Sequence, residues 1–451
     1  MEPNLTRKYG FLTAVAMVVG IVIGSGIFFK TEEVLAASGG NAMIGILALL
    51  IGGAIMLVCA YTFAVLAGRY EKVSGVVDYA EAALGPRYAY YMGWFMAVIY
   101  YPAITSVVLW LSSIYTCRFL RIPTSSPEVV CFAIALFYLV ALAALNALAP
   151  VLSGRFQVST TVIKLLPLLM MAIAGIIRGT LYGTLHENFS SPASGEEAML
   201  PLLLKACVAM AFSYEGWVVA TTVNAELRDA RRNLPRALVW GALIVVTTYI
   251  LYYLGVTGSI ATKELLEKGS LQAFINVFGP AIGSILALFL VISCLGTANG
   301  LMLGCTRGIY ALAVRKEGPS PMLFAQLGRR TGMPHYSALF GLGLTGLWLL
   351  FYVGGPLLGR FGPFRFDSAE LPVVTLYGGY IPVFIQMMRR ERDLGYGKRF
   401  ILPGLSIVGC IFMVVAAVIG HGIDMAWYLL IFFLITALGS WFLHKKREES
   451  D

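Results

Sequence analysis

The first apolar segment of the chain contains the stretch Gly20-Ile21-Val22-Ile23-Gly24-Ser25-Gly26-Ile27-Phe28. Glycine costs about 1 kcal/mol relative to alanine inside a helix, so Gly24 and Gly26 on either side of Ser25 weaken the helix. In lipid, a helix break is tolerated only where the freed backbone groups line a cavity or bind something. The stretch therefore predicts a binding site made of backbone near the middle of a membrane. The alternative is a close contact between two packed helices through Gly20 and Gly24.

The composition of the chain is typical of a polytopic membrane protein. Of its 451 residues, 59% are hydrophobic and only 13% are charged, whereas soluble domains are about 25% charged. Apolar runs of about 20 residues recur along the chain, which is the length that crosses a bilayer as a helix. We expect twelve spans, at residues 10–34, 42–68, 88–117, 128–148, 156–178, 200–225, 237–258, 277–312, 336–353, 369–388, 401–420 and 424–443. The eighth is longer than a bilayer needs and should tilt or protrude.

The charges in the loops predict the orientation of the chain. Most of the 33 lysine and arginine residues fall in alternate loops, beginning with the segment that precedes the first span. Cytoplasmic loops carry such an excess, so both termini are expected in the cytoplasm and the protein in the plasma (cytoplasmic) membrane. The net charge of +9 follows from these loops and does not indicate a nucleic-acid partner.

The sequence lacks the motifs of several other classes of function. The sequence has neither a GxxxxGK[ST] phosphate-binding loop nor a GxGxxG segment after a strand, so ATP-driven pumping is not expected. The seven cysteines are scattered without metal-ligand spacing, and we expect no metal and no cofactor. Cys117 and Cys131 flank one short loop and could pair only if that loop faces an oxidising compartment. The amphipathic stretch 69–85 is either a short helix at the cytoplasmic mouth or a solvated connector.

A second break is expected in the sixth span, at Phe212-Ser213-Tyr214-Glu215-Gly216-Trp217. Glu215 lies about 20 Å into the span at the helical rise. A carboxylate at such a depth costs about 2.5–3.5 kcal/mol, so Glu215 must face protein or water and is a functional candidate.

The two breaks lie five spans apart, so the two segments cross the membrane in opposite directions. This is typical of an inverted repeat whose broken helices meet at the midplane. We therefore expect a single transmembrane domain, 1–451, with one repeat at 10–178, a second at 200–388 and two further helices at 401–443. The alternative is two unrelated weak points in the helices.

Five segments resemble a known family. They are Ile23-Gly24-Ser25-Gly26-Ile27-Phe28, Phe212-Ser213-Tyr214-Glu215-Gly216-Trp217, Gln157-Val158-Ser159-Thr160-Thr161-Val162-Ile163-Lys164-Leu165-Leu166-Pro167, Asn233-Leu234-Pro235-Arg236-Ala237, and Gly296-Thr297-Ala298-Asn299-Gly300 with Arg307. Together they are similar to the amino acid–polyamine–organocation superfamily, and most similar to its L-type amino acid transporter family, prokaryotic type. The similarity covers roughly residues 8–335. The segment Phe366-Asp367-Ser368-Ala369-Glu370-Leu371 departs from the pattern of an L-type member.

The resemblance implies an all-α fold like that of the leucine transporter, with discontinuous helices 1 and 6. It implies a secondary transporter, not an enzyme, that exchanges neutral L-amino acids by alternating access without sodium. Cationic amino acids remain an open alternative, because Glu215 would line the side-chain pocket. The outer loops lack an evident tether cysteine, so we expect that no accessory subunit is required.

The resemblance also assigns roles to the residues of the two breaks. The N–H groups of Ser25, Gly26 and Ile27 would bind the substrate carboxylate. Its ammonium would be held by carbonyls near Val22 and Ile23, just before Gly24, and by carbonyls around Phe212 and Ser213. Phe212 would cover the site as a gate.

Lys164 lies about 14 Å into the fifth span, where an ammonium is costly. In sodium-coupled relatives a sodium ion bridges spans 1 and 8 near this place, so the resemblance implies that Lys164 substitutes for that cation. It would donate to carbonyls near Ile21 to Gly24. The alternatives are that Lys164 extends to the inner surface, or that it carries a proton in an amino acid or polyamine symporter.

Several polar residues are given structural roles. We expect Asn299 to pack and form hydrogen bonds, and Arg307 to be an ion-pair partner near the inner end of span 8. Glu226 and Asp229 are expected to pair with Arg228, Arg231 or Arg232. A different class, an intramembrane transferase, would need clustered Asp, Glu or His at a membrane face, and the sequence has no such constellation.

Overall fold

The computed structural model describes residues 7–24, 26–70, 75–122, 127–191 and 198–448. These residues are helical almost throughout, and within them the only bridge outside helices joins Tyr9 to Leu227. Ten helical segments in the described ranges are long and apolar enough to cross a membrane. The protein is therefore an all-helical, multi-pass membrane protein, as its composition predicts.

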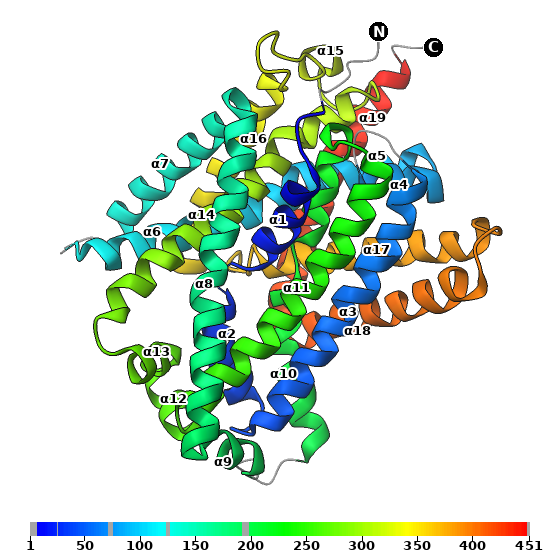
Figure 1. The fold of residues 1–451 in the computed structure, drawn as a ribbon. Helices are drawn as coiled ribbons and strands as arrows, with labels where there is room; N and C mark the ends of the chain where they lie inside the picture. The colour runs from blue at the N-terminus through cyan, green and yellow to red at the C-terminus, as the bar shows by residue number, and fades with distance from the viewer. Residues whose placement is uncertain (1–6, 25, 71–74, 123–126, 192–197, 449–451) are drawn as a thin grey trace.

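The long apolar segments are the main body of the fold (Figure 1). They are α3 (Ala42–Arg69), α5 to α6 (Pro86–Phe95, the π-helical turn η1 Met96–Tyr100, and Tyr101–Leu120), α7 (Pro127–Leu148), α8 (Pro150–Tyr182), α11 (Ala230–Ser259), α14 (Ile282–Ala313), α16 with η4 (His335–Tyr352 and Val353–Leu357), α17 (Glu370–Arg390), η5 with α18 (Gly397–Ile401 and Leu402–His421) and α19 (Ile423–Glu448).

The first expected span is broken where the glycines predict it. Helix α1 (Phe11–Val22) ends before Ile23, which is extended at φ −75° and ψ 90°, and α2 (Gly26–Ala37) begins three residues later. The alternative, a close helix contact through Gly20 and Gly24, holds as well at Gly20, whereas a Cβ on Gly24 would make only an ordinary contact, 3.5 Å from Thr297 Oγ1. A Cβ on Gly20 would lie 2.1 Å from Thr161 Oγ1, so Gly20 allows α1 to approach α8 closely.

The sixth expected span is interrupted in the same way. The α-helix α10 (Met199–Ala211) gives way to a 3₁₀ turn, η2 (Phe212–Tyr214), and then to a longer 3₁₀ helix, η3 (Trp217–Glu226). Between them Gly216 has φ +105°, a conformation that glycine adopts without strain.

Short helices connect the spans and gather at the two ends of the bundle. In Figure 1, α9 (Thr184–Ser190), α12 (Thr262–Lys268) and α13 (Ser270–Phe278) lie at one end, whereas α4 (Val76–Leu84) and α15 (Pro321–Phe324) lie at the other. The amphipathic stretch is thus a helix in its described part, α4. The predicted start of the eighth span, residue 277, is wrong. Gly279 at φ +85° and the following Pro280 separate α13 from α14, which begins at Ile282.

Pro102 changes the hydrogen bonding at the start of α6. Pro102 has no N–H to donate to the carbonyl of Val98, which is four residues earlier. The indole Nε1 of Trp348 donates to Val98 O instead, at 2.9 Å. The π-helical turn just before Pro102 ends at Tyr100, and such turns are frequent at functional sites.

Glycines fix the closest contact between two long helices. A Cβ on Gly175 of α8 would lie 2.0 Å from Gly255 O of α11, and one on Gly255 would lie 2.3 Å from Met171 O. Both obstacles are backbone atoms, so neither helix can yield without separating from the other. In lipid, small residues of this kind drive helix association through close packing.

We predict that Gly255→Ala destabilises the protein by about 1–3 kcal/mol, because overpacking forces the two backbones apart. The measurement is the thermal unfolding midpoint of detergent-solubilised protein. Gly343→Ala is the matched control, since Gly343 is an exposed helical glycine with nothing within 4 Å of its added Cβ. Equal midpoints for the two variants would contradict the close contact.

Candidate functional site

A cavity of about 350 Å³ lies between the two helix breaks and opens to the surface. Its walls come from α1, α2, η1, α6, the η2–η3 break, α11, α14, the end of α16 and the start of α17. Much of the lining is apolar, and the polar lining residues are Lys30, Tyr100, Ser213, Glu215, Tyr249, Thr297, Tyr352, Asp367 and Glu370. This size suits a small solute.

The structure brings most of the sequence-predicted site residues to this cavity. Val22, Gly24, Gly26, Ile27, Ser213 and Glu215 line it. Ile23 is fully buried, and its carbonyl faces Lys164. Ser25 lies outside the described residues. Phe212 begins the 3₁₀ turn η2, and its side chain is likewise outside what the structure describes, so its role as a gate stays a prediction.

Tyr249 of α11 joins the two breaks, and the sequence analysis missed it. Its hydroxyl lies 3.1 Å from Val22 O at the end of α1 and 3.1 Å from Ser213 O in η2. The two carbonyls expected to hold an ammonium thus converge on one hydroxyl group. The chain has 23 tyrosines, many of them inside apolar spans, so its sequence gives no signal that singles out this one.

Lys164 is fully buried and faces the first break from α8. Its ammonium donates to Gly20 O at 2.6 Å, to Ile23 O at 2.6 Å and to Thr297 Oγ1 at 3.1 Å. The expectation of donation to carbonyls beside Gly24 is correct, and Lys164 does not extend to the surface. Thr297 on α14, in the predicted span 8, is the third partner, and its hydroxyl also lies 3.0 Å from Gly20 O.

Glu215 is 8% exposed and lies in the cavity wall. Its Oε1 accepts a hydrogen bond from the Tyr100 hydroxyl at 2.9 Å. Among the described residues, Oε2 has no hydrogen bond of ordinary geometry, although the Tyr377 hydroxyl and the Gly216 N–H interact with this carboxylate. A buried carboxylate oxygen without a partner costs free energy, so this atom is available to a donor on a bound ligand.

The mouth of the cavity carries charged residues from three helices. Glu370 at the start of α17 lies 3.8 Å from Lys30 Nζ on α2 and 3.1 Å from His421 Nε2 on α18. Asp367 caps α17 by accepting from the N–H groups of Ala369 and Glu370, at 2.7 and 2.8 Å. Burial raises the pKa of the Asp367 carboxyl. Asp367 and Glu370 belong to the segment that departs from the L-type pattern.

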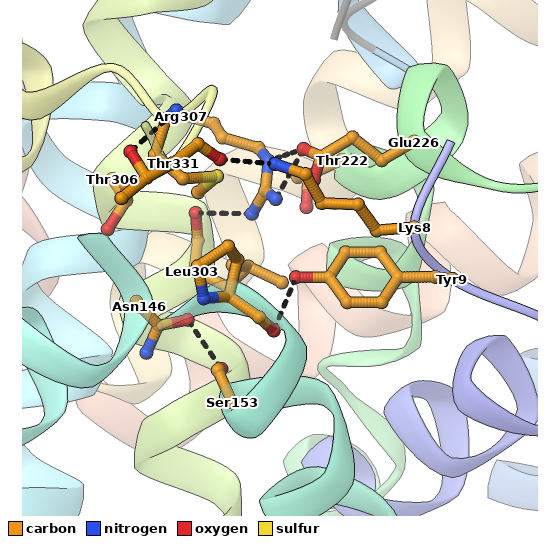
Figure 2. Close-up of polar contacts among 12 residues, drawn as sticks. Lys8, Tyr9, Asn146, Ser153, Thr222, Glu226, Leu303, Thr306, Arg307 and Thr331 are labelled. Atoms are coloured by element: carbon orange, nitrogen blue, oxygen red, sulfur yellow. Dashed lines mark hydrogen bonds and ion pairs between the residues drawn. The ribbon is translucent and has the colours of Figure 1, made fainter. Parts of the chain in front are cut away.

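On the opposite side of the cavity the protein is closed by the contacts in Figure 2. Arg307 of α14 pairs with Glu226 at the end of η3, with Nε to Oε1 at 2.7 Å, and both side chains are buried. The expectation that Glu226 pairs with Arg228, Arg231 or Arg232 is wrong for this contact, because the 3₁₀ helix directs its carboxylate to α14. Arg307 is an ion-pair partner, as expected.

The segment before α1 covers this ion pair (Figure 2). Tyr9 N donates to Glu226 O and Arg228 N donates to Tyr9 O, each at 3.0 Å, while the Tyr9 hydroxyl donates to Pro150 O. Lys8 Nζ donates to Thr331 O at 2.7 Å, and burial lowers the pKa of Lys8. The cavities found beside Arg307 and Tyr9 measure only about 20 and 10 Å³, room for about one water each.

A buried amide network lies between the Lys164 site and this closed side. Asn299 of α14 accepts from Asn146 Nδ2 at 3.0 Å and donates to Gln157 Oε1 at 2.9 Å. Ser153 at the start of α8 lies 2.9 Å from Asn146 Oδ1 (Figure 2). The role expected for Asn299 is therefore confirmed, and the network joins α7, α8 and α14 into one packed unit.

Comparisons with known proteins agree with this geometry. The family model for amino acid permeases matches residues 9–448. The serine/threonine exchanger SteT of Bacillus subtilis (strain 168) is 26% identical, with 91% of each chain covered. The mouse b(0,+)-type amino acid transporter 1 is 26% identical over 98% of this chain and 88% of its own. The human cystine/glutamate transporter is 25% identical over 73% of this chain and 65% of its own.

The match to the family extends past residue 335, where the sequence resemblance weakens, and includes the charged segment at the cavity mouth. The two broken helices, the cavity between them and the family match lead to one conclusion: the chain belongs to the amino acid permease family of the amino acid–polyamine–organocation superfamily and is a secondary amino acid transporter.

Proposed function

We propose that this protein is a sodium-independent exchanger of neutral L-amino acids that works by alternating access. The observation that carries the proposal is Lys164, whose ammonium contacts the carbonyls beside the first break from within the protein. Two features support alternating access. The central cavity opens toward Lys30 and Glu370, whereas the side that holds Arg307 is sealed by a buried ion pair and the Lys8–Tyr9 segment.

The proposed topology has twelve spans and a five-plus-five inverted repeat, with both termini in the cytoplasm. If α1 with α2 forms one span, and α10 with η2 and η3 another, the ten long segments become twelve. Repeat one would cover about 10–178 and repeat two about 200–388, with two helices after them. The similar interruptions in the first and sixth spans support this assignment.

The substrate would bind between the two breaks. Its carboxylate would accept hydrogen bonds from the N–H groups of Ser25, Gly26 and Ile27 at the start of α2, where the helix dipole favours an anion. Its ammonium would donate to the carbonyls of Val22 and Ser213, which already converge on Tyr249. Ile23 O is a weaker candidate than expected, because it accepts from Lys164. Phe212 would cover the site.

The substrate side chain would point at Glu215. Among the described residues its Oε2 has no hydrogen bond of ordinary geometry, so a side chain that donates a hydrogen bond is favoured, while the carboxylate of glutamate would be repelled. A small hydroxyl side chain fits this chemistry and agrees with the name of the Bacillus relative, a serine/threonine exchanger. A cationic side chain is the second candidate for the same oxygen.

A proton-coupled symporter, of amino acids or polyamines, is the alternative mechanism for the same site. Three acceptors surround the three N–H donors of the Lys164 ammonium. Loss of a proton would leave one acceptor without its hydrogen bond, which favours a permanent charge. An intramembrane transferase has less support, because the relatives of known function are transporters and exchangers. We propose further that no accessory subunit is needed.

We predict that uptake of labelled serine or threonine into proteoliposomes requires unlabelled amino acid inside. Replacing sodium by choline should leave both the rate and the KM unchanged, because Lys164 occupies the position of the cation. The control is the same vesicles without internal amino acid. Equal uptake by empty vesicles would exclude exchange, and a sodium-dependent KM would exclude the role of Lys164.

We predict that Lys164→Ala lowers uptake by at least about tenfold, because losing three hydrogen bonds at the break costs more than the 1.4 kcal/mol that corresponds to one factor of ten. Lys205→Ala is the matched control, since Lys205 is an exposed lysine on α10. Full transport by Lys164→Ala at equal expression would refute the assignment. Transport that instead acidifies the vesicle interior would favour proton coupling.

We predict that Glu215→Gln changes selectivity more than it changes the overall rate. Inhibition constants of serine and lysine should rise several-fold relative to that of alanine, because an amide accepts a hydrogen bond from the side chain less strongly than a carboxylate does. Competition against labelled substrate measures these ratios. Glu264→Gln, a change at an exposed carboxylate on α12, is the control. Unchanged ratios for Glu215→Gln would remove Glu215 from the selectivity pocket.

A further inference from the structure

Two cysteine side chains face each other at the junction of α6 and α7. The Sγ atoms of Cys117 and Cys131 lie 3.4 Å apart, and both residues are free thiols in the structure. A disulfide bond is about 2.05 Å long. The two sulfurs therefore need to approach by little more than 1 Å, a distance that small rotations of two side chains can cover.

The helices around the two sulfurs hold them in this arrangement. Next to Cys117, the hydroxyls of Thr116 and Tyr138 lie 2.9 Å apart and join α6 to α7 again. Helix α6 ends with Arg121 in the left-handed conformation at φ +50°, and Ile122 N donates to Cys117 O at 3.1 Å. The position of Cys117 is thus fixed by the end of its helix as well as by its neighbour.

The path of α6 places this pair on the open side of the transporter. Tyr101, at the start of α6, lines the small cavity beside Arg307 on the closed side. The next turns carry Ile104, Val107, Val108 and Leu111, which line the central cavity. Cys117 follows Leu111 by six residues, about 9 Å farther along the helix. It therefore lies beyond the cavity, toward the side on which the cavity opens.

We propose that Cys117 and Cys131 form an intramolecular disulfide when this side of the protein meets a disulfide oxidant. The Cys117 thiolate attacks the oxidant disulfide, which releases one thiolate and leaves a mixed disulfide on Cys117. The Cys131 thiolate then attacks the Cys117 sulfur and releases the second thiolate. The two protein thiols lose two protons and two electrons, and the oxidant becomes two thiols.

Access favours Cys117 as the thiol that meets the oxidant first. Cys117 is half-buried, whereas the other six cysteines, its neighbour Cys131 included, are buried. The bond would close a loop of 14 residues and join α6, which lines the cavity, to α7, which packs on α8 and α14. It is therefore a covalent link between a cavity wall and the packed unit behind it, independent of which amino acid is carried.

The test begins with the full-length protein in native membranes, treated with glutathione disulfide or with buffer. Remaining thiols are then alkylated under denaturing conditions, and peptides are analysed by mass spectrometry. We expect a Cys117–Cys131 linked peptide in the oxidised sample, lost again after treatment with a phosphine reductant. Alkylation of both cysteines after oxidation would overturn the proposal, as would a Cys117 link to a second copy of the chain, seen as a dimer on a non-reducing gel.

A second measurement uses purified variants. Oxidation should raise the thermal unfolding midpoint of the parent protein and of the control Cys207→Ser by several degrees, because the cross-link restricts the unfolded chain. Cys117→Ser and Cys131→Ser should show no such rise. A rise of equal size in these two variants would assign the effect to other thiols and refute the pair.

Discussion

The structure depends on one constraint: a helix broken inside a membrane leaves backbone groups that water cannot reach. The protein meets this constraint at the first break with a fixed cation. Lys164 supplies donors to the carbonyls of Gly20 and Ile23, and Thr297 approaches the same carbonyls from α14. Because each unsatisfied group in lipid costs several kcal/mol, the break exists only while α8 and α14 support it.

The helices that support the break, α8 and α14, are held in place by contacts outside the binding site. Glycine pairs bring α8 and α11 into backbone contact, and the Asn146–Asn299 network joins α7, α8 and α14. Tyr249 and Lys164 reach the break at the end of α1 from two different helices, α11 and α8. Precise positions for two polar groups thus rest on close packing, which tolerates little change in volume. The packing contacts and the polar site residues come from separate parts of the sequence, but they belong to the same packed group of helices.

Much of the fold followed from the sequence because its signals are local. Apolar length predicts spans, and Gly24 and Gly216 mark the breaks. The contact of Lys164 with the break was implied by the family resemblance, and it agrees with the fact that a buried ammonium needs acceptors and a broken helix offers them. The partner of Glu226 was not predictable, because the direction of its side chain depends on the 3₁₀ winding of η3, which brings it to Arg307 on α14. Tyr249 was not predicted for a related reason: a tyrosine in an apolar span is usually a packing residue, and only the fold shows which groups it faces.

The Tyr249 hydroxyl has one hydrogen atom but lies 3.1 Å from two carbonyl oxygens, Val22 O and Ser213 O. It can therefore donate fully to only one of them at a time. One of the two broken helices therefore always lacks a full hydrogen bond from this residue. An alkylammonium group, with three hydrogens, could satisfy both carbonyls at once. Occupancy by such a group would then act as a structural tie between the two breaks, so that the loaded protein is more rigid at its centre than the empty one.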